Sequence, residues 1–135
     1  MNTGGILMDK ILMEKINNCS WADWRLDKIE IDYECIIISV SNESEVIVKF
    51  SCNNFIGLSI VGHWDESVIE SISIEDNGCL IKDSIETIKR LNGDNPLKGG
   101  GIKDINDEWY QMNIKLIDGI ILKFAFRDIE DVTHI

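Results

Sequence analysis

The sequence predicts a small α+β protein in which an N-terminal amphipathic helix packs on a mainly antiparallel sheet, built from a meander and a C-terminal hairpin. Two observations predict this class. Apolar residues recur at helical spacing near the N-terminus and then at two-residue spacing in the middle and at the end of the chain. The 135 residues are 44% hydrophobic and 27% charged, as in globular domains, and no repeat or linker divides them. We therefore expect residues 1–135 to form a single domain.

The first predicted element is a helix within residues 6–16. Charged residues separate its apolar positions, which follow three- and four-residue spacing: Met8, Ile11, Leu12 and Ile16. Thr3 is the expected cap, and residues 17–18, both asparagine, are expected to end the helix. The following segment, WADW at residues 21–24, then leads into the sheet.

Residues 28–50 predict a three-stranded meander. Ile29 and Ile31 alternate with charged residues, the run 35–40 is almost wholly apolar, and Val46, Val48 and Phe50 share one face of a third strand. Two weaker strand candidates follow at residues 55–62 and 67–74. The pattern is typical of consecutive antiparallel strands joined by short polar turns.

A second, short helix is predicted near residues 84–92. Asn77-Gly78 favours a tight turn, and Asp83 with Glu86 resembles a capping box at the start of a helix that Gly93 would end. Residues 93–107 are rich in glycine and aspartate and predict a long loop. Long loops are either functional or disordered, and the sequence does not separate the two cases.

The C-terminal hairpin has a predictable register. A three-residue loop ending at Gly119 keeps the apolar residues on one face, whereas a two-residue turn does not. The predicted pairs are Tyr110 with Phe126, Met112 with Phe124, Ile114 with Leu122, and Leu116 with Ile120. Gly119 should adopt positive φ. The opposite, wetter face is expected to carry Trp109 across from Arg127, where a cation–π contact can form.

The charge of the chain disfavours two classes of partner. Its net charge is −11, and both halves carry an excess of acidic residues. Nucleic acids and anionic membranes need clusters of lysine and arginine, so we expect neither as a partner, whereas a basic protein is favoured. No apolar run approaches the length of a membrane span, and Asp9 and Lys10 interrupt residues 6–13, which therefore do not resemble a signal peptide. We expect a cytoplasmic protein.

The four cysteines are predicted to be reduced and structural. Cys19, Cys35, Cys52 and Cys79 are spread along the chain without any CxxC pair. Because most of them adjoin apolar runs, they are interpreted as small hydrophobic residues. The sequence predicts neither a metal site nor a cofactor.

Residues 63–66, His-Trp-Asp-Glu, hold the densest set of reactive side chains. One hypothesis places His63 and Asp65 with Cys52 in a nucleophilic or hydrolytic site. However, neither helical nor strand spacing points the three polar side chains of this segment at one atom, so a solvated turn is the favoured interpretation. The LKGGG run at residues 97–101 lacks the features of a phosphate loop and indicates flexibility.

The tryptophans and their neighbours supply the candidate binding residues. Trp24 is assigned to the core, whereas Trp64 and Trp109, which have polar neighbours, are expected to be partly exposed. The candidate contacts with a partner are Trp64, Asp65, Glu66, Trp109 and Arg127.

Three short patterns carry a resemblance to a known group of proteins. WADW at residues 21–24, GHWDE at 62–66, and the stretch from Trp109 to the LIDG run at 116–119 occur in an order of elements that resembles small bacterial immunity proteins of polymorphic toxin systems. That resemblance implies an acidic, cytosolic and catalytically inert protein that blocks a toxin's active site or an adjacent surface.

The sequence thus leaves three functional hypotheses. The favoured one is a non-catalytic protein-binding domain with an acidic surface. In the form that the resemblance implies, it is an immunity-type inhibitor that binds a basic toxin domain. The alternatives are a small enzyme using the cysteine, histidine and aspartate described above, and a homo-oligomeric structural protein assembled through an exposed sheet edge.

Overall fold

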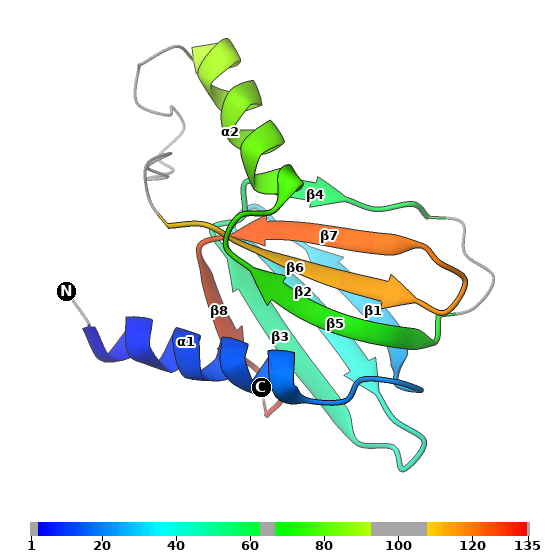
Figure 1. The fold of residues 1–135 in the computed structure, drawn as a ribbon. Helices are drawn as coiled ribbons and strands as arrows, with labels where there is room; N and C mark the ends of the chain where they lie inside the picture. Colours follow the sequence, from blue (N-terminus) through cyan, green and yellow to red (C-terminus); the bar gives the residue numbers. More distant parts are fainter. Residues whose placement is uncertain (1–2, 63–66, 93–107, 135) are drawn as a thin grey trace.

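The structure, a computed structural model, describes residues 3–62, 67–92 and 108–134 (Figure 1). These residues form two helices and eight strands. In chain order they are α1 (Thr3–Asn18), β1 (Arg25–Ile31), β2 (Cys35–Ser41), β3 (Ile47–Asn53), β4 (Gly57–Ser59), β5 (Ile69–Glu75), α2 (Cys79–Asn92), β6 (Tyr110–Leu116), β7 (Ile121–Phe126) and β8 (Asp128–Asp131). The predicted α+β class is confirmed. Neither helix is long and apolar enough to cross a membrane, within these described ranges.

The strands form two antiparallel sheets, where one had been predicted. Their orders are β1-β2-β3-β8 and β4-β7-β6-β5. Two long ribbons bend from one sheet into the other, because β3 continues into β4 and β7 continues into β8. At the bend, Arg127 donates its backbone N–H to the Asn53 carbonyl at 3.2 Å, and Ile56 donates to the Ala125 carbonyl at 2.8 Å. A period-two pattern shows that strands exist but does not show where a strand changes sheets.

The main core lies between the facing sheets. β2 and β3 have the predicted inward faces, and Ile38 pairs with Phe50 across them. The exceptions are at strand ends, where Ile31 and Val46 were expected on apolar faces but are 51% and 49% exposed. β1 starts three residues before the predicted position, because a bulge after Leu26 keeps both Leu26 and Ile29 on the core side. Trp24 packs against this core as expected, and its ring lies 4.9 Å from that of the buried Trp21.

Helix α1 is longer than predicted and crosses the edges of both sheets (Figure 1). Its predicted end at residues 17–18 is confirmed. Met13 and Ile16 are buried, but Ile11, which was expected on the same face, is 41% exposed. The reason is that the face in contact with the sheets also includes the polar side chains of Asp9 and Asn17, so the buried stripe is rotated away from Ile11. The side chain of Met8 lies outside the described part.

Helix α2 begins at Cys79, not near residue 84, and Asn77-Gly78 leads into this helix instead of forming a hairpin turn. The start depends on a distant side chain. Gln111 on β6 accepts the backbone N–H of Leu80 at 2.9 Å, which satisfies one of the donors at the start of the helix. A local capping pattern cannot reveal a partner 31 residues away. The predicted Gly93 cap and the loop 93–107 lie outside the described residues.

The C-terminal hairpin has the predicted register. Strand pairing joins Tyr110 with Phe126, Met112 with Phe124 and Ile114 with Leu122, and Leu116 donates its N–H to the Ile120 carbonyl at 2.9 Å. Gly119 has φ of +94°, as expected. The prediction of a wetter second face is wrong at one end of the hairpin. Helix α2 covers that end, so Trp109, Gln111 and Ala125 are buried.

Candidate functional site

The structure divides the predicted binding residues. Trp64, Asp65 and Glu66 lie outside the described residues, as does His63. Trp109 and Arg127 are described, but Trp109 is only 4% exposed, so its expected exposure was wrong. The alternation along β6 is the reason, since it directs Trp109 toward α2 and Tyr110 toward the opposite side of the strand.

Arg127 lies at the bend between β7 and β8. Its Nε is 3.2 Å from Asp128 Oδ2, and the Asn54 side-chain amide donates to the same oxygen at 3.0 Å. The residue therefore helps to hold the bend and neutralises one acidic neighbour. The cation–π contact of Arg127 with Trp109 remains a prediction.

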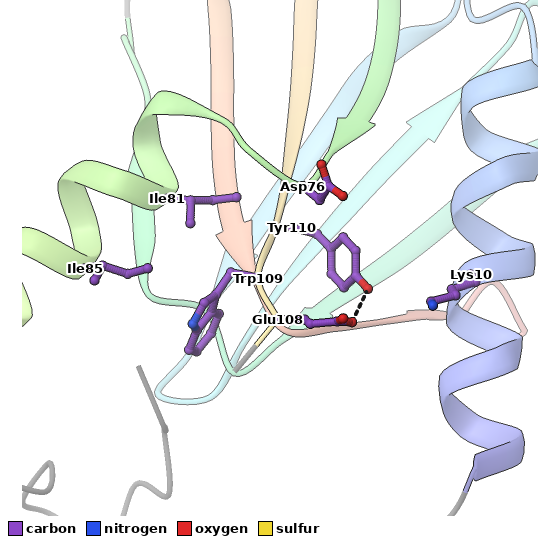
Figure 2. Close-up of a pocket in the computed structure, with 7 residues that line it drawn as sticks. All are labelled: Lys10, Asp76, Ile81, Ile85, Glu108, Trp109 and Tyr110. Carbon is purple, nitrogen blue, oxygen red and sulfur yellow. Dashed lines mark hydrogen bonds between the residues drawn. The ribbon is translucent and has the colours of Figure 1, made fainter. Parts of the chain in front are cut away.

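A hollow of about 430 Å³ opens where α1, α2, the end of β5 and the start of β6 meet (Figure 2). We call it the Tyr110 pocket. It is lined by Lys10, Asp76, Ile81, Ile85, Glu108, Trp109 and Tyr110. These residues come from segments far apart in the sequence, so the pocket exists only in the folded chain.

One side of the Tyr110 pocket is apolar. Ile81 and Ile85 are one helical turn apart on α2 and point toward the Trp109 ring (Figure 2). Ile81, Trp109 and Ala125 form a small buried cluster against which Ile85 packs. This side of the pocket is therefore hydrophobic.

The other side is acidic. The Tyr110 hydroxyl donates a hydrogen bond to Glu108 Oε2 at 3.1 Å (Figure 2). β5 pairs with β6 so that Glu75 lies opposite Gln111, which brings the next residue, Asp76, beside Tyr110. Lys10 reaches this side from α1 and is the base among the described lining residues. The phenol thus lies between carboxylates that approach from two strands.

The pKa of Tyr110 reports the electrostatics of this side. Burial raises it to about 12, and the hydrogen bond to Glu108 and the negative charges of Glu108, Asp76 and Asp9 act in the same direction. The carboxylates belong to three different elements or their flanks. Asp9 itself experiences the charges of Asp128 and Glu130 on β8. An acidic region therefore extends from the Tyr110 pocket along α1 to β8.

A second hollow, of about 370 Å³, lies on the outer face of β5, β6 and β7 beside the start of α2. Its polar side chains bond to one another: Gln111 donates to Asn113 at 2.7 Å, and Asn113 donates to Glu75 at 2.6 Å. Lys115 forms an ion pair with Glu70 at 3.0 Å. Because these groups already satisfy each other, the Tyr110 pocket is the better candidate for a ligand.

The cysteine chemistry considered from the sequence finds no support in the geometry. All four cysteines are free thiols. Cys52 is fully buried in the core, and burial raises the pKa of its thiol, so the thiolate is strongly disfavoured and out of reach of a substrate. Within the described ranges, no group of three histidine, cysteine or acidic residues could hold a metal ion.

Comparison with protein-family models, with curated proteins and with solved structures returned no match for this chain.

Most of the pocket was not predicted from the sequence. Tyr110 was expected to be a core residue of the hairpin, and it is indeed half-buried against Phe126, with ring centroids 6.4 Å apart. Glu108, Asp76 and Lys10 were not singled out. The sequence does show an acid and two aromatic residues in succession, Glu108, Trp109 and Tyr110, which could have indicated this site. It does not show that β5 pairs with β6 and so brings Asp76 beside them.

Proposed function

We propose that this chain is a non-catalytic protein-binding domain that holds a basic protein against the acidic region around the Tyr110 pocket. The observation that supports this function best is the convergence of Glu108, Asp76 and Asp9 on the single phenol of Tyr110. Opposite charges at an interface accelerate association and select the partner, and neither effect needs a catalytic group.

The resemblance to immunity proteins of polymorphic toxin systems suggests which basic protein this is. In that form of the proposal the partner is a basic toxin domain, and the chain inhibits it by covering its active site or a neighbouring surface. The predicted contacts in the same interface remain Trp64, Asp65, Glu66, Trp109 and Arg127. Trp109 takes part through the apolar side of the pocket, which it lines.

The two alternatives are less well supported. The enzyme hypothesis relied on Cys52 as nucleophile, and this thiol is enclosed by the core. The homo-oligomer hypothesis needs a sheet edge that accepts another strand. On the outer strand β1, Lys28 and Glu30 form an ion pair at 2.6 Å, and charged side chains on an edge strand discourage such pairing.

The proposal is tested with the C-terminal domain of the protein encoded beside this chain in its genome. The two are co-expressed, and complex formation, growth and the association rate at several salt concentrations are measured. We expect a stable complex, relief of any toxicity, and an association rate that falls as salt rises, because exposed charges are screened over roughly 8 Å at physiological ionic strength. No complex, or an association rate indifferent to salt, would contradict the proposal.

A matched pair of double variants locates the charges that matter. Glu108→Gln with Asp76→Asn removes two charges from the Tyr110 pocket. Glu43→Gln with Asp27→Asn removes the same number from exposed positions in the β2–β3 turn and on β1. The pocket pair should slow association more than the control pair, and equal effects would show that only the net charge of the chain matters.

A further inference from the structure

We infer that the Tyr110 pocket receives an arginine side chain of the protein partner, an inference that rests on the proposed function and names the group recognised at that site. The pocket has an apolar side next to an acidic side (Figure 2). An arginine side chain has the same division, since an aliphatic stem carries a planar cation at its end.

The apolar side fits the stem of an arginine that lies across the pocket. Ile81 and Trp109 are buried and Ile85 is half-buried beside them, so methylene groups that pack against this side would lose contact with water. The hollow measures about 430 Å³ and lies toward the lower end of the range of ligand pockets, roughly 300–1,000 Å³. A single long side chain with its adjoining backbone suits this size better than a whole helix does.

The acidic side fits the guanidinium group. The Tyr110 hydroxyl donates its hydrogen bond to Glu108 Oε2, while Glu108 Oε1 has no partner among the described residues and remains available as an acceptor. Asp76 provides a second carboxylate at the opposite end of the Tyr110 ring from Glu108 (Figure 2). Two carboxylates outnumber the single charge of Lys10 within the described lining, so the acidic side favours a cation.

The aromatic ring between two carboxylates favours arginine over lysine. A guanidinium group can stack on the half-buried ring of Tyr110 and donate several hydrogen bonds in its plane. An ammonium group is more strongly hydrated and lacks a flat face, so it gains less from an aromatic ring placed between two acids.

The test uses a small probe, so it does not require the partner. Nα-acetyl-arginine methylamide is titrated into the full chain, and the NMR signals of the Trp109 indole and the Tyr110 ring are followed. Blocked citrulline, which has a similar shape without the charge, and blocked lysine serve as comparison probes. We expect saturable shifts at both rings with blocked arginine, a Kd on the order of 1 mM for so small a ligand, and binding at least about threefold weaker for the other two probes.

Variants then assign the binding to the pocket. Glu108→Gln with Asp76→Asn should weaken the binding of blocked arginine by about threefold to tenfold, whereas Glu43→Gln with Asp27→Asn should change it less than about twofold. All four positions are exposed, and thermal unfolding of each double variant confirms that it is folded. Equal binding of citrulline or of lysine, equal effects of the two variant pairs, or an absence of shifts at both rings would overturn the inference.

Failure of the inference and failure of the proposed function give different results. If the chain forms a salt-sensitive complex with the domain encoded beside it but does not bind blocked arginine, the proposed function stands and the arginine site is wrong. If the chain binds blocked arginine in the pocket but forms no complex with that domain, the arginine site stands and the proposed function is wrong.

Discussion

The side chain of Asn17 bonds to the backbone of Ile74 as a neighbouring strand would. Its Nδ2 donates to the Ile74 carbonyl at 3.1 Å, and its Oδ1 accepts the Ile74 N–H at 2.7 Å. β5 is an outer strand, so this amide covers part of an otherwise open edge. Near the middle of α1, Asp9 accepts the backbone N–H of Ile129 on β8. Helix α1 is thus bound to an edge of each sheet.

Replacement of Asn17 should destabilise the protein. Asn17→Ala leaves both polar backbone groups of Ile74 without their partner, and we expect the free energy of unfolding to fall by about 1–3 kcal/mol. Urea denaturation measures this change. Asn18→Ala is the matched control, because its side chain is exposed at the next position of the helix. Equal losses in the two variants would show that helix propensity, and not attachment to β5, accounts for the effect.

Replacement of Asp9 should, in contrast, stabilise the protein at neutral pH. Burial raises the pKa of Asp9, and the charges of Asp128 and Glu130 add to the increase, while the hydrogen bond from Ile129 opposes it. Because the folded pKa exceeds the unfolded one, the stability contributed by the protonated carboxyl is complete below the unfolded pKa and is lost as pH rises through the folded pKa. Asp9→Asn keeps an acceptor for Ile129 without the charge.

We therefore expect Asp9→Asn to unfold at a higher temperature than the parent chain at neutral pH. The gain in the free energy of unfolding should be below about 1 kcal/mol. The gain should disappear toward about pH 3, where the parent carboxyl is protonated. Glu14→Gln, an exposed charge removal on the same helix, should show no such pH dependence. A stability gain that is constant with pH would contradict the assigned cause.

Gly78 should not tolerate a larger residue. A Cβ atom at this position would lie 2.1 Å from Gln111 Oε1, and Gln111 is 2% exposed and held by hydrogen bonds at both ends of its amide. We expect Gly78→Ala to cost about 1–3 kcal/mol of stability. Gly62→Ala is the control, because no atom of the described residues lies within 4 Å of its added Cβ.

A double-mutant cycle tests the cause of the Gly78→Ala effect. In a Gln111→Ala background the clash is absent, so Gly78→Ala should cost clearly less than it does in the parent chain. If the two costs are the same, the contact with Gln111 is not responsible.

The parts of the fold that were predicted from the sequence are those specified by nearby residues. The register of the C-terminal hairpin follows from side-chain parity and from Gly119, and both are local. The same holds for the adjacency of β2 and β3, which was predicted from the short polar turn between them. The end of α1 at residues 17–18 was predicted because asparagine commonly ends helices.

The parts that were missed depend on contacts between distant residues. The start of α2 depends on Gln111, and the wet face expected for Trp109 is covered by that same helix. The Tyr110 pocket likewise needs β5 beside β6 and α1 across the sheet edges before Asp76 and Lys10 approach Glu108. Composition predicted the acidic character of the surface, but only the fold indicates where the acids gather.

The titration of Tyr110 directly measures how strongly the nearby carboxylates act on its hydroxyl group. Its pKa of about 12 exceeds the ordinary value of 10, mainly through burial and then through Glu108. The chain has two tyrosines, so Tyr33→Phe leaves Tyr110 as the single phenol, and its ionisation can be followed by ultraviolet absorbance. We expect a midpoint near pH 12 in the folded protein and, because the unfolded chain releases this proton near pH 10, a loss of stability as pH rises between these values.

Glu108→Gln in the Tyr33→Phe background separates the contributions of burial and charge. It removes one negative charge and the charged hydrogen-bond acceptor but leaves the ring buried, so the midpoint of Tyr110 should fall toward 10 without reaching it. Glu43→Gln in the same background is the control for net charge and should leave the midpoint where it was. A midpoint near 10 in the parent chain, or equal shifts in the two variants, would show that the carboxylates do not converge on this phenol and would remove the main support for a basic partner at the Tyr110 pocket.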